Sequence, residues 1–369
     1  MHLLIVGEKT LPIHLEYNFV GVHKNNDCSW DNITISGNNE NTQAYVYADF
    51  CGLHAGSEIL LYLEKPKLDN IREGGRFIGI FEVVSPRLFY EPNGDYLKEE
   101  LNRNLIYRLR IQPKIIYSQG VSEWQAIDEM TDFKSVLDIP WSIIYRKLVG
   151  GRGCTPLLPH EAEIMRKMLD MRNHGLIINH ENLSFDFTTL SLVQNINESL
   201  EYKGNTEFFQ DIGPRLIHLI QNTDRKWEPQ LQAYLMQEIR RNDELTNQLF
   251  PNTNITWIGN EIYAGAGMQR IDILIYSEND LNKFIHLIEL KAVEANSYTA
   301  SQMNRYIKWI KSHIPNISIN QIIPTVIAPS INNNYNTELK TFLRGHGITQ
   351  YRNILVDQNL NFHQTIQTV

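Results

Sequence analysis

Apolar residues in the first 150 positions fall in short runs that are separated by turn-forming residues. The runs are rich in β-branched and aromatic side chains, which favour strands. They occupy residues 44–48, 58–63, 76–84, 105–111 and 142–146. Glycine and asparagine are dense at residues 37–41, where we expect an exposed loop. This pattern predicts a small barrel or a strongly curved sheet.

The spacing of apolar residues becomes helical after residue 158. Ile164, Met168 and Met171 recur four and three residues apart, so we expect a helix over residues 159–171. The stretch that follows, up to residue 226, shows little periodicity apart from a short helix at about 212–221. We interpret it as a connector.

Helices and strands alternate from Trp227 onward. The predicted elements are a helix in two pieces at 228–250, strands at 270–276 and 284–292, a helix at 298–312, a strand at 321–328 and a helix at 336–344. This order is typical of an α/β or α+β domain with a mixed sheet.

The patterns divide the 369 residues into a β-rich domain at 1–172, a helical connector at 173–226 and an α/β domain at 227–369. The length suits two domains of roughly 100–200 residues each. The predicted fold class is therefore α+β with two domains. The first is expected to be a β-barrel and the second an α/β domain with a mixed sheet.

Charge and cysteine usage narrow the class of protein. Lys and Arg number 34 against 42 Asp and Glu, a net charge of −8, so any contact with nucleic acid must use local basic patches. Cys28, Cys51 and Cys154 are far apart and form no C-x-x-C pair. This argues against a disulfide framework and a cysteine zinc site, and it fits a reducing cytoplasm. No long apolar run and no basic leader is present, so we expect a cytoplasmic protein without a membrane partner.

Charged residues interrupt two otherwise apolar strands of the second domain. Glu289 and Lys291 lie two residues apart and should therefore point to the same face of their strand. Asp272 is a single carboxylate in the preceding predicted strand, and antiparallel pairing would place it beside Glu289. Two carboxylates with an ammonium group form an oxygen-lined site suited to Mg²⁺. The alternative is a cross-strand ion pair on a solvated sheet face.

Five blocks in order resemble the NucS/EndoMS branch of the PD-(D/E)XK nucleases. They are residues 228–235, 270–274, 287–292, 302–306 and 326–330. The resemblance implies that Asp272, Glu289 and the carbonyl of Leu290 hold Mg²⁺, for which Mn²⁺ is a possible substitute. It further implies that Lys291 and Gln302 act on the attacking water.

The same resemblance leaves two points open. Glu228 opens the matching helix and is the preferred additional ligand, but a longer stretch follows it than the family pattern has, so Glu238 remains the alternative. Tyr306 lies one helical turn after Gln302, and its role is either functional or that of a polar surface residue.

The first domain resembles PUA-like domains of the YTH/EVE type. The matching pieces are residues 56–62, 75–86, 105–111 and 150–159. Such domains hold a flipped or single-stranded modified base among aromatic side chains, which replace the lost stacking. The candidate base-binding residues are Trp30, Asp31, Asn32, Phe89 and Tyr90. Arg146, Lys147 and Arg152 form a basic loop suited to phosphates, or else a solvated turn.

Together the two resemblances favour a modification-dependent DNA endonuclease of the type IV restriction kind. The expected partner is double-stranded DNA with methylated bases, cut by a homodimer, because cutting both strands takes two sites. No nucleotide cofactor is expected, since residues 150–153 do not form a phosphate-binding loop. The alternatives are a NucS-like mismatch or structure-specific endonuclease, and a non-catalytic reader of modified nucleic acid. Among modifications, N6-methyladenine, 5-methylcytosine and hydroxymethylated bases stay open.

Overall fold

The computed structural model places the chain in two compact units, Met1–Gln210 and Asp211–Val369. The residues it describes are 1–23, 37–65, 75–91, 96–127, 136–144, 153–206, 211–224, 226–239, 241–265, 267, 269–280 and 282–369. The predicted connector, 173–226, is thus divided between the two units.

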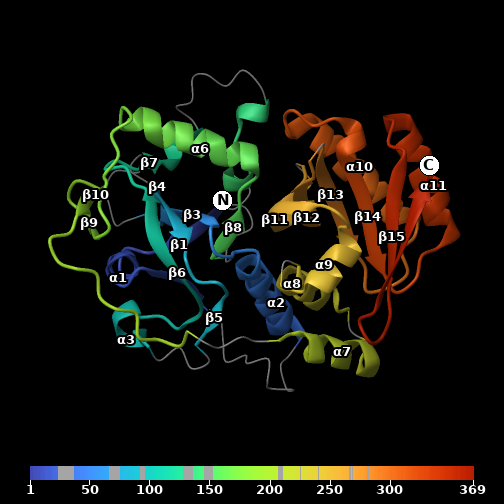
Figure 1. Ribbon diagram of the computed structural model, residues 1–369, viewed down its shortest axis with the longest axis horizontal. Coiled ribbons are helices and arrows are strands. Elements are labelled where there is room, and N and C mark those ends of the chain that lie inside the picture. The colour runs from blue at the N-terminus through green and yellow to red at the C-terminus, as the bar shows by residue number, and fades with distance from the viewer. Residues whose placement is uncertain are drawn as a thin grey trace. The chain divides into compact units, whose positions relative to one another are not determined.

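A sheet with strand order β2-β6-β4-β3-β1-β8 forms the centre of the first unit (Figure 1). Its strands are β1 (His2–Val6), β2 (Phe19–His23), β3 (Glu58–Leu63), β4 (Arg76–Val83), β5 (Phe89–Tyr90), β6 (Leu105–Ile115), β7 (Val121–Ser122) and β8 (Cys154–Pro156). The long strand β6 pairs with β2 and β5 through its first half and with β4 through its second half. The sequence predicted a small barrel or a strongly curved sheet. Within the described residues the hydrogen-bonded path ends at β2 and β8, so it does not close into a barrel there.

Helices and a hairpin complete the first unit. They are α1 (Leu11–Glu16), α2 (Gly37–Cys51), α3 (Lys98–Leu101), α4 (Glu123–Ile127), the 3₁₀ turn Val136–Asp138, α6 (Pro159–Arg172), and the hairpin of β9 (Leu183–Asp186) and β10 (Ser191–Gln194). Helix α6 packs its apolar residues Ala162, Met165 and Leu169 against β1, β3 and β4 in one buried cluster. The helix predicted at residues 159–171 is therefore confirmed.

Three predictions for the first unit were wrong. Residues 37–41 and 44–48, predicted as a loop and a strand, both lie in α2. Of the strand predicted at 142–146, the described residues 142–144 are helical. In α2 the buried side chains Ala44, Tyr47 and Ala48 recur three and four residues apart, which is the spacing of a helix face. A run of only five apolar residues is compatible both with the spacing of a helix face and with the alternation of a strand. The β-branched and aromatic composition of the run therefore led to the wrong prediction.

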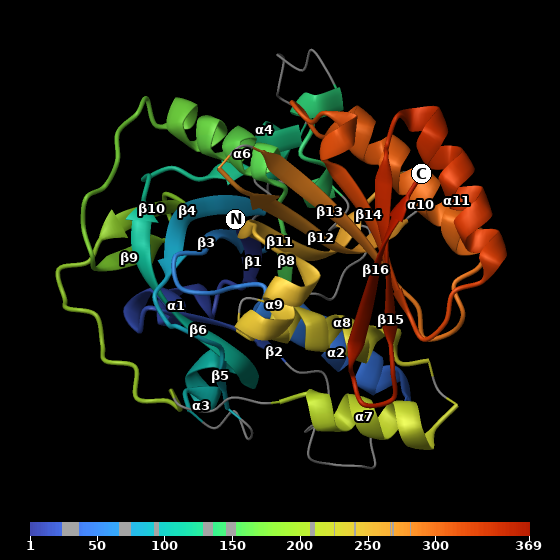
Figure 2. The same ribbon diagram turned by 45° about the vertical axis from the view of Figure 1, so that its right-hand side comes forward.

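The second unit contains a six-stranded mixed sheet in the order β11-β12-β13-β14-β15-β16 (Figure 2). The strands are β11 (Asn254–Tyr263), β12 (Arg270–Glu278), β13 (Lys283–Leu290), β14 (Ile322–Ala328), β15 (Gln350–Val356) and β16 (Phe362–Thr368). Strands β13, β14 and β15 run parallel and are joined by α10 (Ser297–His313) and α11 (Asn333–His346), whereas the other neighbours pair antiparallel. The predicted α+β class with a mixed sheet is confirmed.

Helices cover both faces of this sheet. Asn336 of α11 accepts from the side chain of Asn353, whereas Arg352, the preceding residue of β15, donates to the carbonyl of Leu249. Successive strand residues point to opposite faces, so α11 and α9 (Asp243–Leu249) lie on opposite sides. The remaining elements are α7 (Gly213–Asn222), α8 (Glu228–Glu238) and the 3₁₀ turn Ile319–Gln321. None of the helices that the structure describes is long and apolar enough to span a bilayer.

Candidate functional site

Asp272 and Glu289 lie side by side on adjacent strands. The pairing of β12 with β13 begins at Ile273↔Ile288, so the next residues outward are Asp272 and Glu289. The backbone N–H of Leu290 donates to Oδ2 of Asp272 at 2.7 Å. Gln232 of α8 donates to the backbone carbonyl of Asp272 at 2.6 Å and fixes this end of β12. The structure therefore brings together the two carboxylates that the sequence pairs.

Lys291 follows the last residue of β13 and turns back toward it. Its Nζ donates to Oε1 of Glu289 at 2.5 Å and to the carbonyl oxygen of Leu290 at 3.0 Å. The Glu289 side chain is 2% exposed and that of Lys291 16%. The ammonium group thus bridges the carboxylate and the carbonyl that the sequence assigns to a cation.

The helix carboxylate at this site is Glu228. Its Oε1 accepts from the backbone N–H of Ala292 at 3.1 Å, which anchors the chain just after Lys291. Glu238, at the other end of α8, forms an ion pair with Arg241 at 3.0 Å. The geometry therefore favours Glu228 of the two candidates.

A further carboxylate at the site, Glu261, was not predicted from the sequence. It lies on β11 between the paired residues Asn260 and Ile262, opposite Asp272, and forms an ion pair with Arg270. Its φ of 51° is in the left-handed region, which is unusual for a strand residue. The pair Asn260-Glu261 interrupts an apolar stretch much as Asp272 does, and this was the available signal.

Gln302 and Tyr306 come from α10 and face the site together. Nε2 of Gln302 donates to the Tyr306 hydroxyl at 3.3 Å, and that hydroxyl donates to the carbonyl of Arg270 at 2.6 Å. Tyr306 thereby ties α10 to the start of β12. Within the described structure Oε1 of Gln302 is buried without a hydrogen-bond partner, so it can still accept a bond.

The electrostatics of the site favour protons or cations. Burial raises the pKa of Asp272 well above its usual range, and the neighbouring Glu289 and Glu261 carboxylates raise it further against the opposing effect of Lys291. Burial likewise raises the pKa of Glu289 to about 7, although the Lys291 ammonium lowers it. For Lys291, the attraction of Glu289, Asp272 and Glu228 outweighs burial and raises the pKa.

The residues fit a divalent cation by charge and by donor type. When ionised, four carboxylates face two cationic groups, an excess of two negative charges that equals the charge of one Mg²⁺. They are Glu228, Glu261, Asp272 and Glu289 against Arg270 and Lys291. Oε2 of Glu289 is buried and lacks a hydrogen-bond partner among the described residues, so a ligand oxygen is free. Those residues include no group of three or more His, Cys, Asp or Glu already spaced as a metal site, so the Leu290 carbonyl would have to serve beside Asp272 and Glu289.

Of the predicted base-binding residues, the structure describes Phe89 and Tyr90, and it places neither in an open site. Phe89 is 4% exposed and its ring lies 6.3 Å from that of Tyr202, while Tyr90 is 1% exposed and lies 5.6 Å from Tyr107. Both rings belong to the core in this structure, and a base could stack on them only if that core opened. Trp30, Asp31, Asn32, Arg146, Lys147 and Arg152 lie outside the described residues.

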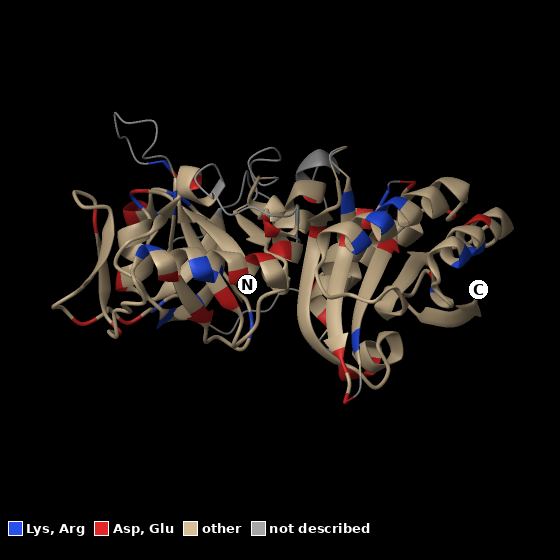
Figure 3. Ribbon diagram, turned by 90° about the horizontal axis from the view of Figure 1, so that it is seen from above, with Lys and Arg blue, Asp and Glu red and all other residues tan. Residues whose placement is uncertain are grey.

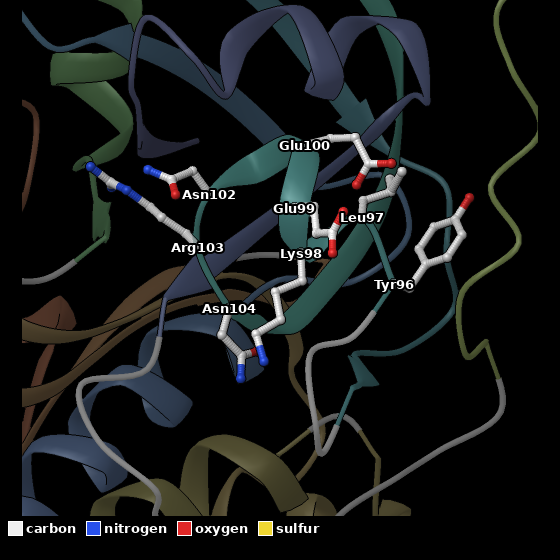
Figure 4. A pocket seen from close by; sticks show the side chains of 8 residues that line it. All are labelled: Tyr96, Leu97, Lys98, Glu99, Glu100, Asn102, Arg103 and Asn104. Atoms are coloured by element: carbon white, nitrogen blue, oxygen red, sulfur yellow. The ribbon is translucent and has the colours of Figure 1, made fainter.

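The first unit does contain an open cavity of about 840 Å³ around α3. Its lining consists of Tyr96, Leu97, Lys98, Glu99, Glu100, Asn102, Arg103 and Asn104. Tyr96 and Arg103 lie on opposite sides of α3 (Figure 4). Neither Phe89 nor Tyr90, the two predicted base-binding residues that the structure describes, lines it. Figure 3 shows acidic and basic residues interspersed along the ribbons of both units.

No family model and no curated protein matches the chain. Among solved structures, a repair endonuclease from Pyrococcus abyssi is 21% identical over 30% of this chain and 46% of its own, with a TM-score of 0.21. EndoMS in complex with double-stranded DNA is 13% identical over 45% and 51%, with a TM-score of 0.22. The MspJI restriction endonuclease with a 27-mer oligonucleotide is 11% identical over 94% and 72%, with a TM-score of 0.23. The chain matches about half the length of the first two, and TM-scores as low as these carry no argument about its fold or its function.

Proposed function

We propose that the chain is a Mg²⁺-dependent DNA endonuclease whose active site is built on Asp272, Glu289 and Lys291. One observation supports the proposal above all: two carboxylates with raised pKa values lie side by side, and one buried oxygen, Oε2 of Glu289, lacks a partner among the described residues. A structural ion pair would have no need of an unpaired oxygen, because such an atom costs free energy. A cation-binding site needs one.

The roles of the residues follow from their contacts. Asp272, Glu289 and the Leu290 carbonyl would hold Mg²⁺, with Glu228 nearby as an additional or water-mediated ligand. A bound Mg²⁺ supplies charge stabilisation for the phosphate and lowers the pKa of a bound water. Gln232 and the N–H of Leu290 hold the Asp272 backbone and carboxylate in place.

Lys291 and Gln302 would act on the water and the phosphate. The ammonium group of Lys291 contacts both Glu289 and the Leu290 carbonyl, so it can reach a water bound there and offset the charge of a phosphate oxygen. Oε1 of Gln302 accepts no hydrogen bond within the described structure and can orient that water. Tyr306 positions Gln302 through its hydroxyl.

Modified bases are the proposed trigger for cleavage. This part of the proposal is supported by the resemblance of residues 1–172 to PUA-like domains and by Trp30, which stands in a polar stretch where core packing gives no reason for it. A NucS-like mismatch nuclease and a non-catalytic reader are the competing functions, and each predicts a different substrate response.

The decisive experiment incubates the full chain and Mg²⁺ with four matched duplexes: unmodified, 5-methylcytosine, N6-methyladenine and mismatched. We expect cleavage of one modified duplex only. Asp272→Asn keeps an oxygen for the Leu290 N–H but lowers the charge, and it should reduce the cleavage rate by about 10³-fold or more. Glu228→Gln should lower the rate, while Glu238→Gln on the same helix serves as the control and should not.

Each alternative has its own outcome. Cleavage of the mismatched duplex alone would replace the modification-dependent function by mismatch repair. Modified-duplex binding without any cleavage in Mg²⁺ or Mn²⁺ would make the chain a reader. Wild-type rates for Asp272→Asn would remove the proposed active site.

A further inference from the structure

The last strand of the second unit, β16, leaves one edge of the sheet open. It pairs with β15 over seven positions, from Gln350↔Thr368 to Val356↔Phe362, without a register shift (Figure 2). The N–H of Val369 donates to the carbonyl of Thr349 at 2.9 Å, and hydrogen-bonded pairs alternate along an antiparallel ladder. The odd-numbered residues of β16 therefore bond to β15, and the even-numbered residues point their N–H and C=O groups away from the sheet.

These outward groups are free over most of the strand. The carbonyl of Phe362 accepts from the side chain of Gln248, so the first outward carbonyl of β16 is already bonded. For Gln364, Ile366 and Thr368, the described residues supply no backbone partner on the outer side. The Ile366 side chain is 57% exposed. Three consecutive outward positions are thus available for pairing, with an apolar residue in the middle.

The opposite edge of the same sheet is built differently. Strand β11 has a register irregularity between Ile255 and Trp257, and it carries the ion-paired Glu261 in a left-handed conformation. Bulges and charges are the devices by which edge strands avoid pairing with other chains. β16 has neither: its sequence FHQTIQT contains no Lys, Arg, Asp, Glu or Pro. One edge is protected and the other is not.

We propose that β16 is the dimerisation edge of this protein and that its partner is β16 of a second copy. Antiparallel pairing about a two-fold axis at Ile366 would match Ile366 with itself and Gln364 with Thr368 in both directions. All three pairs join outward-pointing residues, so each exchanges two backbone hydrogen bonds. The two Ile366 side chains would lie directly opposite each other on one face. An uncharged strand suits self-pairing, because no like charges meet.

Such a dimer would also explain how both strands of a duplex are reached, a step that rests on the proposed function. The two-fold axis stands perpendicular to the joined sheet, so each copy keeps the same face on the same side. Asp272 and Glu289 share that face with Val326 and Asn353, because these residues follow one another across the register. Both active sites would then open on one side of the joined sheet.

The test measures the mass of the full chain by analytical ultracentrifugation over a concentration series, without DNA or metal. The wild type should reach twice the monomer mass. Ile366→Lys should shift the dissociation constant at least tenfold toward the monomer, and Ile366→Pro, which removes one outward N–H, should do the same. Leu355→Lys is the control: it adds the same charge to an exposed residue of β15, one strand away from the edge, and should leave the dimer intact.

Amide hydrogen exchange on the wild type gives an answer that does not depend on variants that fold. In the dimer the amides of Gln364, Ile366 and Thr368 should be protected, and dilution should expose them while those of His363, Thr365 and Gln367 stay protected. A monomeric wild type, or a dimer that survives both Ile366 variants, would overturn the proposal. Asp272→Asn should still dimerise, so loss of cleavage and loss of pairing are separate results.

Discussion

Arg108 in the first unit and Glu289 in the second are 0% and 1% exposed, yet their surroundings differ. Arg108 donates to the carbonyls of Leu105 and Tyr96 at 2.6 and 2.7 Å, and its guanidinium lies over the Phe19 ring at 5.4 Å. Glu289 contacts Lys291 with one oxygen, and its other oxygen has no partner in the described structure. The charged group of Arg108 is thus surrounded by bonding partners, whereas the carboxylate of Glu289 has one oxygen without a partner in the described structure.

A second comparison, between two residues of the same type, shows the same difference between an enclosed charge and an incompletely bonded one. Glu161 and Glu289 are both buried carboxyls, and burial raises the pKa of each to about 7. The two oxygens of Glu161 accept from the backbone N–H groups of Ser142 and Leu158 at 3.0 and 3.1 Å, which ties α6 to the segment before it. A shifted pKa therefore does not by itself mark a functional group. The unpaired oxygen and the neighbouring carboxylates separate Glu289 from Glu161.

Arg108→Ala should have the largest effect on stability. It empties a large side-chain volume in the core and removes the guanidinium donor from the buried carbonyl of Leu105 and the partly buried carbonyl of Tyr96. We therefore expect a loss of at least about 3 kcal/mol. Denaturant unfolding of the full chain measures it, and Arg108→Lys should recover only part because an ammonium cannot match the planar fork. Mg²⁺ binding by the second unit should be unchanged. A stable Arg108→Ala chain would mean that this enclosed charge contributes little.

For both glutamates we expect the free energy of unfolding to depend on pH in the same direction. The expected change is somewhat smaller than that for Arg108→Ala. Each folded-state pKa, about 7, lies above the ordinary value of 4.5. The stability contributed by each protonated carboxyl is therefore present below about pH 4.5 and is lost as the pH rises to about 7. Glu161→Gln and Glu289→Gln should each flatten this profile, by an amount on the order of 2–3 kcal/mol. Chemical denaturation at pH 5 and pH 8 measures it.

Mg²⁺ should then distinguish the two glutamates. At pH 8 the cation should stabilise the wild type and Glu161→Gln by RT ln(1 + [Mg²⁺]/Kd), about 3 kcal/mol at a hundredfold excess over Kd. It should have much less effect on Glu289→Gln, which lacks a charged ligand. Equal stabilisation of all three chains would place the cation elsewhere.

The sequence predicted the second unit better than the first, for a physical reason. Asp272, Glu289 and Lys291 interrupt long apolar strands, and Gln302 and Tyr306 lie one turn apart on a helix, so local patterns sufficed. Glu261 was missed because the strand it interrupts, β11, was not predicted, and its place opposite Asp272 depends on the pairing of β11 with β12. Residues 44–48 were misassigned because their helical burial depends on the sheet they pack against. Strands β15 and β16 were missed as well: β16 is a polar edge strand without a clear alternation.

Trp30→Ala should have the smallest expected effect, which is on DNA binding. It tests whether the first unit contains a functional site. Trp30 lies outside the described residues, in a polar stretch with Asp31 and Asn32 beside it. If it stacks on an extruded base, its loss should weaken binding to the modified duplex by about 1–3 kcal/mol, or roughly five- to a hundredfold. Binding to unmodified DNA runs through phosphates and should barely change.

Trp124→Ala, which removes a ring that is 40% exposed in α4, is the control. Equal weakening of both duplexes, together with a lower melting temperature, would make Trp30 a core residue, and the first unit would then have no aromatic candidate left except rings that the structure buries.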